Sequence, residues 1–532
     1  MERKYIYEKV KKNIEILNKG LVEREEIISL AILAILSKEN ILLIGPPGTA
    51  KSEISRRVSS VIEKKKYFEY LLTKFTTPEE IFGPISIKNL ENDIFKRVIN
   101  GYMPDSHITF LDEIFKANSS ILNALLTLLN EKIYHNGNNI EKSNLISIIA
   151  SSNEIPLNEE ELQALYDRFI LKLTVEYVND LKELVFIDED DYNEKNIKKF
   201  TLKEIEEINN LSKNEKISDE IVEKIIKIKQ EIEKEYENSN EVINEKISDR
   251  KFVKTIKLLK LVSFLNNKDE ITIDDLIVLK NIFWSDPKNI NRVKTIIINN
   301  ICLTGKNYDK KINMIYNSWE ENFEEIFKIQ EKDSNGNLLY LDINGEKTTE
   351  VKGKIHLKDE FGDFLFFKGH REYIKIAKQL SSWDHDYEDT GIITIDGRKI
   401  WKYEFSNIQI IKTNKNNVEG YEKLFEIGKL KPLLLSGYNE FIKKNLKLSE
   451  DKKEKLETIT INIKKEYKIV FEKYNEISKI YNEIKKYIYN NLFIVEKDKD
   501  YVIKKIENNK KNIELIVEKY NKLLEKINMV KK

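Results

Sequence analysis

The residues of this chain best suited to chemistry form a glycine-rich segment near its start, Gly45-Pro46-Pro47-Gly48-Thr49-Ala50-Lys51-Ser52. Two glycines followed by Lys and Ser at this spacing are typical of a phosphate-binding loop. In such a loop, backbone N–H groups and the positive end of the following helix point at the β-phosphate, while Lys51 reaches the β- and γ-phosphate oxygens. Ser52 then offers a hydroxyl to Mg²⁺. The segment therefore predicts a site for ATP and Mg²⁺.

A pair of adjacent acids at the end of an apolar run is the second candidate for chemistry. Asp112 and Glu113 follow the β-type residues 108–111, and successive side chains of a strand point to opposite faces. Asp112 could hold Mg²⁺ through its water shell, and Glu113 could polarise the water that attacks the γ-phosphate. Alone, two such acids would more often cap a helix, but paired with the upstream loop they predict ATP hydrolysis.

Three further polar residues stand where they could complete such a site. Asn153 follows the apolar strand 145–150 and could orient the attacking water, although an isolated Asn is more often a turn residue. Arg168 lies among apolar neighbours, where an arginine is either a surface ion pair or a group that reaches the γ-phosphate of a neighbouring subunit. Arg250 lies in the first turn of an amphipathic helix that Ser248 or Asp249 would cap.

The elements around these residues predict an α/β fold. Ile41–Ile44 reads as a short buried parallel-type strand, and residues 53–58 after the loop read as a helix. Residues 180–300 are mostly helical by period. Two segments, 85–98 and 134–144, have turn residues between β-type residues and predict hairpins, which are either substrate contacts or simple sheet edges.

The second part of the chain has a different pattern. Apolar residues recur every three or four positions from Tyr308, and again from 463 to 488 and from 513 to 527, which predicts three long packed helices. Between them, residues 332–437 carry hairpin signals such as Asp396-Gly397 and one helical segment near 372–380. We therefore expect a discontinuous three-helix bundle with an inserted small β-rich domain.

The composition restricts the class of protein. The 90 basic and 90 acidic side chains cancel, so no overall field favours nucleic acid or an anionic membrane. The single cysteine, Cys302, excludes an internal disulfide and reads as a small buried apolar residue. Without an apolar leader or a stretch long enough to span a bilayer, we expect a cytoplasmic protein that is not integral to a membrane.

The motifs together resemble those of AAA+ ATPases, and among these the MoxR branch. Besides the phosphate loop, the resemblance rests on the segments 76–84, 101–104, 110–118 and 125–131. It implies that Asn153 is the sensor 1 residue, that Arg168 is an arginine finger acting in trans, and that Arg250 is the sensor 2 residue. Lys251 departs from the pattern, because the nearest relatives often carry a second arginine there, and Arg and Lys are not interchangeable in bidentate contacts.

The order of parts is similar to that of the RavA group within this branch. That resemblance implies a homo-hexamer, a von Willebrand A-domain partner of the ViaA type, and contact between residues 332–437 and an inducible lysine decarboxylase. The periods and turn signals divide the chain into five parts: an ATPase core over residues 1–180, a helical lid over 181–302, the first part of a triple-helical domain over 303–331, the inserted β-rich domain over 332–437, and the second part of the triple-helical domain over 438–532.

Three functions are compatible with these patterns. The hypothesis we favour is a ring ATPase that remodels protein clients in a chaperone-like way. A nucleic-acid-stimulated motor is an alternative from the wider AAA+ group, disfavoured by the neutral charge balance and by the lack of a basic domain. An ATP-dependent binding switch with little turnover is a second alternative, disfavoured by the presence of Glu113, which a site without hydrolysis would not need.

Overall fold

The computed structural model of the chain divides into two compact units, Met1–Asp309 with Phe471–Leu515, and Lys310–Val470 with Ile516–Lys532. Each unit is described by itself. The structure describes residues 2–137, 139–155, 160–185, 192–237, 247–304, 308–336, 338–341, 347–349, 431–435 and 437–531, together with short strands between 354 and 426.

The first unit is built on a five-stranded sheet in the order β2-β3-β6-β1-β7, in which all neighbouring strands are parallel. The strands are β1 Ile41–Ile44, β2 Tyr67–Leu71, β3 Ile108–Asp112, β6 Ser147–Ser152 and β7 Leu171–Thr174. The central strands β1 and β6 are buried along their whole length, as expected where helices cover both faces. The predicted α/β fold is confirmed.

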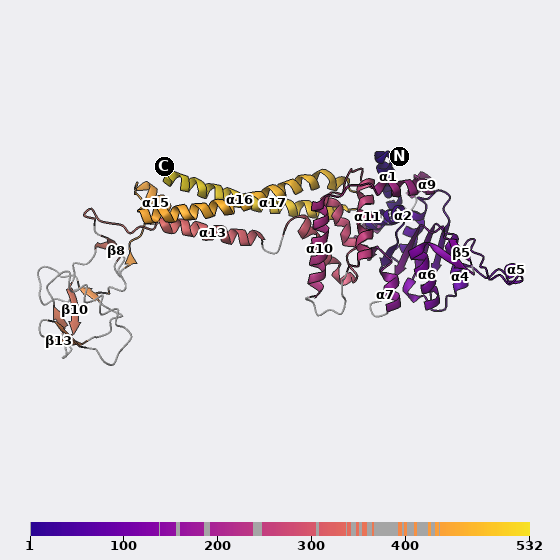
Figure 1. Cartoon of the computed structure of the whole chain (residues 1–532), viewed down its shortest axis with the longest axis horizontal. Coiled ribbons are helices and arrows are strands. Elements are labelled where there is room, and N and C mark those ends of the chain that lie inside the picture. The colour runs from indigo at the N-terminus through magenta and orange to yellow at the C-terminus, as the bar shows by residue number, and fades with distance from the viewer. Residues whose placement is uncertain are drawn as a thin grey trace. The chain divides into compact units, whose positions relative to one another are not determined.

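Helices pack around this sheet (Figure 1). α2 is buried from Ile27 to Leu36, which matches its uninterrupted apolar sequence. The Asn118 side chain accepts a hydrogen bond from the Ile121 N–H and so caps α6. The helices of this layer are α1 Arg3–Asn18, α2 Glu25–Ser37, α3 Lys51–Ser59, α4 Pro78–Phe82, α6 Ser119–Glu131, α7 Glu160–Tyr166 and α9 Leu202–Ser212, whereas the short helix α8 Leu181–Val185 is exposed.

A second group of helices follows the sheet, where the helical period predicted a lid. These helices are α10 Asp219–Glu237, α11 Asp249–Leu265, the 3-10 helix η5 Ile273–Asn281 and α12 Ile290–Ile301. Of the two predicted capping residues, it is Ser248 that caps α11, by accepting from the Lys251 N–H at 3.2 Å. α11 also packs against α1, α2 and α9, so this helix joins the lid to the core.

Of the two predicted hairpins, 134–144 contains a pair of antiparallel strands, whereas 85–98 contains a single antiparallel bridge around a helical turn, and the two segments are hydrogen-bonded to each other. The segment 85–98 pairs Ile85 with Arg97 and contains a helical turn, α5 Ile87–Leu90. The other hairpin is formed by β4 Ile133–Asn136 and β5 Asn139–Lys142. Asn136 joins them, because its side chain accepts from the Arg97 N–H at 2.6 Å and donates to the Arg97 carbonyl at 3.2 Å.

Residues 471–515 complete the first unit and pack on the lid. They comprise the end of α16 Glu450–Tyr487, the 3-10 turn η9 Ile488–Asn490 and the start of α17 Glu496–Lys531. Asn491 donates to Asp274 at 2.8 Å, and Asn509 donates to the Cys302 carbonyl at 2.8 Å. Cys302 is buried as predicted, and this burial raises the pKa of its thiol to about 12.

The second unit contains three long helical segments, as the period predicted: α13 Tyr308–Ile326 and the remaining parts of α16 and α17. Tyr520 is buried and packs edge-on against Tyr316 with ring centroids 5.2 Å apart. The helix expected near 372–380 lies outside the described residues. Short strands bear out the β-rich character of 332–437, including β8 Leu339–Leu341, β9 Lys347–Thr349, β10 Lys354–Lys358, β11 Phe364–Phe366, β12 Ile392–Ile395, β13 Arg398–Trp401, β14 Gln409–Ile411, β15 Leu424–Glu426 and β16 Lys431–Pro432.

Among the helices that the structure describes, none has the length and apolar character needed to cross a lipid bilayer.

Candidate active site

The phosphate loop runs from the end of β1 to the start of α3, as the sequence predicts. Gly48 has φ +78° and Ala50 has φ +64°, so the chain turns sharply twice before Lys51. Gly45 lies against β7: a Cβ there would come within 2.0 Å of the Val175 carbonyl oxygen. The loop is therefore held close to the sheet, with the N-terminus of α3 open to an anion.

Lys51 is buried at the base of this loop. Its Nζ donates to the carbonyl oxygens of Gly45 and Pro46, both at 2.7 Å. Burial lowers the pKa of Lys51, while the charges of Asp112 and Glu113 oppose that shift. A cation held next to two carboxylates and to the N-terminus of a helix suits the binding of a nucleotide phosphate with its divalent metal ion.

The two acids and the predicted sensor lie together at the carboxyl ends of β3 and β6. The Asn153 Nδ2 donates to Glu113 Oε1 at 2.6 Å, and the Lys116 ammonium lies 3.4 Å from the same oxygen. Asp112 accepts a hydrogen bond from the Ser151 hydroxyl. Because parallel strands end at one edge of the sheet, these groups face the same edge as the phosphate loop.

The donor set at this edge fits Mg²⁺ bound with ATP. Magnesium prefers oxygen ligands and keeps several waters, so it needs only one or two protein groups beside the phosphates. Ser52, in the first turn of α3, offers a hydroxyl, and Asp112, two strands away from β1, offers a carboxylate. When bound, the ion would neutralise charge that develops on the phosphate oxygens.

The two predicted arginines lie at the opposite edge of the sheet. Arg168 precedes β7, whose first residue, Leu171, donates to the Asn40 carbonyl just before β1. Arg250 donates to Asn130 at 2.6 Å, at the end of α6. The structure therefore brings Arg168 and Arg250 together, and places both away from the phosphate loop of their own subunit.

The two arginines also influence each other electrostatically. Burial is the larger cause that lowers the pKa of Arg168, and the positive charge of Arg250 lowers it further. The Nε of Arg168 is buried and finds no hydrogen-bond partner among the described residues. Two cations held close together repel each other, and this arrangement favours the binding of an anion between them.

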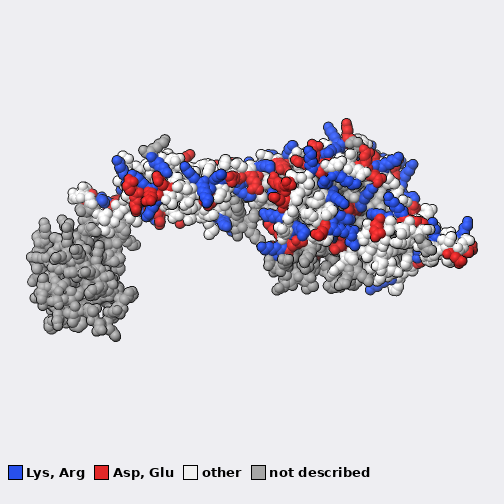
Figure 2. Space-filling model, in the orientation of Figure 1, with Lys and Arg blue, Asp and Glu red and all other residues white. Residues whose placement is uncertain are grey.

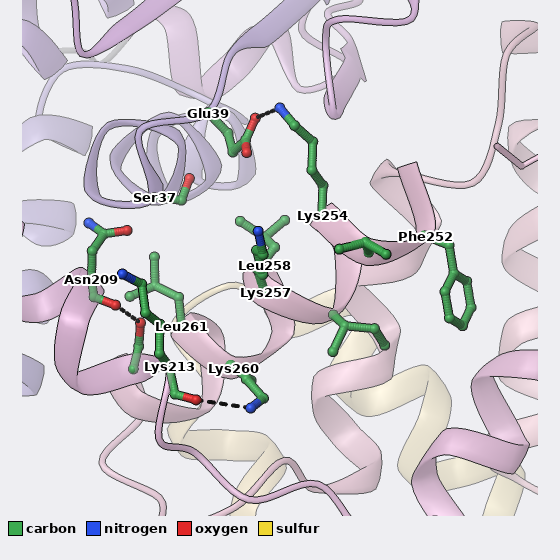
Figure 3. Close-up of a pocket in the computed structure, with 13 residues that line it drawn as sticks. Ser37, Glu39, Asn209, Lys213, Phe252, Lys254, Lys257, Leu258, Lys260 and Leu261 are labelled. Carbon is green, nitrogen blue, oxygen red and sulfur yellow. Dashed lines mark hydrogen bonds and ion pairs between the residues drawn. The ribbon is translucent and has the colours of Figure 1, made fainter. Parts of the chain in front are cut away.

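The position of α11 is fixed by contacts along this same edge (Figure 3). Lys254 forms an ion pair with Glu39, which precedes β1, and Lys260 donates to the Lys213 carbonyl at 3.0 Å. Between α11 and the ends of α2 and α9 lies a pocket of about 430 Å³. This pocket is not the nucleotide site, because the phosphate loop, Asp112 and Glu113 do not line it.

Sequence reasoning identified the phosphate loop and the acids but missed several residues around them. Lys116 contacts Glu113, Ser151 contacts Asp112, and Arg24 donates to the Thr49 carbonyl within the phosphate loop at 3.3 Å. Ser151 lies one residue after the predicted strand and could have been found as a polar group at its tip. No local signal marks Arg24, because its partners are distant in the sequence.

Two family models match the part of the chain that carries this site. Residues 8–213 match the family model described as the MoxR domain in the MoxR-vWA-beta-propeller ternary systems, and residues 220–297 match an AAA lid domain.

Two curated relatives come from Methanocaldococcus jannaschii, and both are called uncharacterized. MJ0079 is 42% identical over 293 residues, which cover 55% of this chain and 74% of the relative. MJ0812 is 43% identical over 282 residues, which cover 52% and 72%. A solved chain from Cytophaga hutchinsonii is 21% identical to this chain, covers 56% of this chain and 95% of its own length, and superposes with a TM-score of 0.45. The family models and the well-covered relatives, taken with the loop and its acids, show that this chain belongs to the MoxR-type AAA+ ATPases.

Proposed function

We propose that this chain hydrolyses Mg-ATP in a ring whose active sites lie between subunits, and that it uses the energy to remodel protein clients. The observation that carries this proposal is the separation of the site into two halves. Lys51 and Glu113 lie at the carboxyl edge of the sheet, whereas Arg168 and Arg250 lie at the amino edge. One subunit cannot bring these groups onto a single γ-phosphate, but two adjacent copies can.

In this arrangement each residue has a distinct role. The phosphate loop and Lys51 bind the phosphates, and Glu113 polarises the attacking water, with Asn153 orienting it. Arg168 and Arg250 of a neighbouring copy stabilise the charge that develops in the transition state. In the described conformation Asn153 and Lys116 both contact Glu113, so Glu113 must give up at least one of these contacts before it can act on water.

The two hydrogen-bonded segments, 85–98 and 133–142, support a role in contacting protein clients. Apolar side chains are exposed along them, as in Phe95 at 49% and Ile140 at 64%, and exposed apolar groups on a projection are typical of protein contacts. Figure 1 shows α5 at the end of this projection. The matching family model is named for systems that contain a vWA protein, and we propose an A-domain partner of the ViaA type for this chain.

The proposal extends to the assembly, the location and the partners of the chain. We also propose a homo-hexamer, on the basis of the resemblance, and a cytoplasmic location, on the basis of the composition. Binding of a lysine decarboxylase would use residues 332–437, most of which lie outside the described residues. Figure 2 shows acidic and basic side chains interspersed on the visible face, which favours a protein client over nucleic acid.

The test compares nucleotide binding with hydrolysis over a range of protein concentrations. A fluorescent ATP analogue should bind to dilute subunits, because the phosphate loop is complete in each copy. Phosphate release per subunit should rise as sedimentation shows that rings form. Equal turnover by monomers and rings would contradict a site shared between subunits, and absence of any turnover by assembled rings would contradict hydrolysis.

A further inference from the structure

A buried arginine connects the phosphate loop to the first helix turn of α2. Arg24 is 5% exposed and precedes α2 directly. Its Nε donates to the Thr49 carbonyl in the phosphate loop at 3.3 Å, and its guanidinium also donates to the Glu176 carbonyl after β7 at 2.9 Å. Arg24 therefore holds the loop against the end of the sheet. A movement of Thr49 would displace Arg24 and, with it, the start of α2.

Glu26, two residues after Arg24 in the first turn of α2, contacts the lid. The Glu26 carboxylate forms an ion pair with the Lys280 ammonium at 2.6 Å and accepts from the Asn281 side chain at 2.9 Å. Both partners belong to η5 of the lid. Glu26 thus connects the segment that touches the phosphate loop to the segment that follows α11.

Lys280 continues this connection to the C-terminal part of the first unit. Its ammonium contacts Asp498 in the first turn of α17 as well as Glu26. The Lys280 side chain is 8% exposed and that of Asp498 is 3% exposed. Lys294 also contacts Asp498, but its side chain is 29% exposed. Burial opposes the charge on Lys280, whereas Glu26 and Asp498 together raise its pKa above the ordinary value.

We propose that Arg24 and Lys280 are positioning residues that link nucleotide binding to the start of α17. This inference rests on the proposed binding of ATP at the phosphate loop. A buried ion pair resists separation because each unpaired charge would stay desolvated, so Lys280 and Asp498 move together. Glu26, whose side chain is 26% exposed, joins this pair to α2 through its ion pair with Lys280 and its hydrogen bond from Asn281.

When ATP binds, its phosphates replace the loop carbonyls as partners of Lys51, and the conformation of the loop changes. Arg24, which is bonded to this loop, then moves with the start of α2. Glu26 and Lys280 transmit this movement to α17.

Coupling of this kind is reciprocal. If ATP stabilises the contact between Lys280 and Asp498, then that contact must tighten the binding of ATP by the same factor. Coupling between sites commonly amounts to roughly 5- to 150-fold in affinity, and we expect about tenfold for this connection.

The test uses full-length protein that carries Glu113→Gln, so that ATP stays bound. ATP affinity is measured by calorimetry, and hydrogen exchange is measured across residues 496–506 with and without Mg-ATP. The test variant is Lys280→Met, and the matched control is Lys294→Met, which also removes a cation from Asp498. We expect Lys280→Met to weaken ATP affinity about tenfold and to abolish the ATP-dependent protection of these residues, whereas Lys294→Met should preserve both.

A second variant covers the case in which Lys280→Met does not fold. Glu26→Gln leaves Lys280 paired with Asp498 and cuts the connection on the side of the core, so it should also abolish the ATP-dependent protection. If either test variant keeps that protection with an ATP affinity within twofold of Lys294→Met, the inference is wrong. If the parent protein binds ATP without any change in exchange at α17, the inference also fails, while failure to bind ATP at all would instead refute the proposed function.

Discussion

Replacement of Arg168 by alanine distinguishes an arginine that acts across the sheet within one subunit from one that touches the γ-phosphate of a neighbour. β7 has 4 residues, so at roughly 3.3 Å per residue it separates Arg168 from its own phosphate edge by about 13 Å. Two unit charges at that distance interact by about 1 kcal/mol at an effective dielectric constant of about 20. An effect within one subunit is therefore less than about tenfold in rate.

Direct contact in trans predicts a much larger loss. Arginine fingers contribute about 10³-fold or more to turnover, which corresponds to roughly 4 kcal/mol of transition-state stabilisation. We expect Arg168→Ala to lower kcat by at least about 10³-fold at saturating Mg-ATP and at a protein concentration where rings form.

A control must show that removal of an arginine elsewhere in the protein does not lower turnover. Arg292 forms a partly exposed ion pair with Glu235 at 3.2 Å in the lid, and such pairs are worth about 0–1 kcal/mol. Arg292→Ala should therefore keep turnover within a few-fold of the parent protein. A loss below tenfold for Arg168→Ala in intact rings would refute the trans contact.

Four further outcomes follow from the site and its surroundings. Glu113→Gln should lower kcat by about 10²- to 10⁴-fold while ATP affinity, measured by calorimetry, stays unchanged, because the carboxylate acts on water and not on binding. Gly45→Ala should weaken ATP binding by roughly 5- to 150-fold in the same measurement, since its Cβ would lie 2.0 Å from the Val175 carbonyl oxygen and such overpacking costs about 1–3 kcal/mol. Lys116→Met should raise the turnover of dilute protein by no more than about fivefold, because the ion pair to Glu113 involves a lysine that is 47% exposed and is worth at most about 1 kcal/mol. Cys302 should resist iodoacetamide at pH 8 in the native protein, because burial raises the pKa of its thiol to about 12, and mass spectrometry should detect its alkylation only after unfolding.

The parts of the site that follow one another in the chain were predictable. Strand, glycine loop and helix are contiguous, so the period and the motif located Lys51 without knowledge of the fold, and the acids after β3 could be assigned in the same way. The lid and the long helices were also predictable, because their apolar periods extend over many turns.

The contacts between distant segments were not predictable. Arg24 contacts Thr49 and Glu176, which lie on two different strand ends, and only the order of strands in the sheet brings them together. The same holds for the contact between Lys280 and Asp498. The sequence also could not tell at which edge of the sheet Arg250 lies, because that depends on how α11 packs against the core.

Mixing two inactive subunits tests the central claim most directly. Lys51→Ala protein should not bind ATP productively but keeps Arg168 and Arg250, while Arg168→Ala protein keeps an intact phosphate loop. When the two are mixed under conditions in which rings exchange subunits, some interfaces combine an intact loop with intact arginines, so the account predicts that ATP hydrolysis returns. Rings that are shown to contain both variants and yet stay inactive would contradict a site shared between subunits.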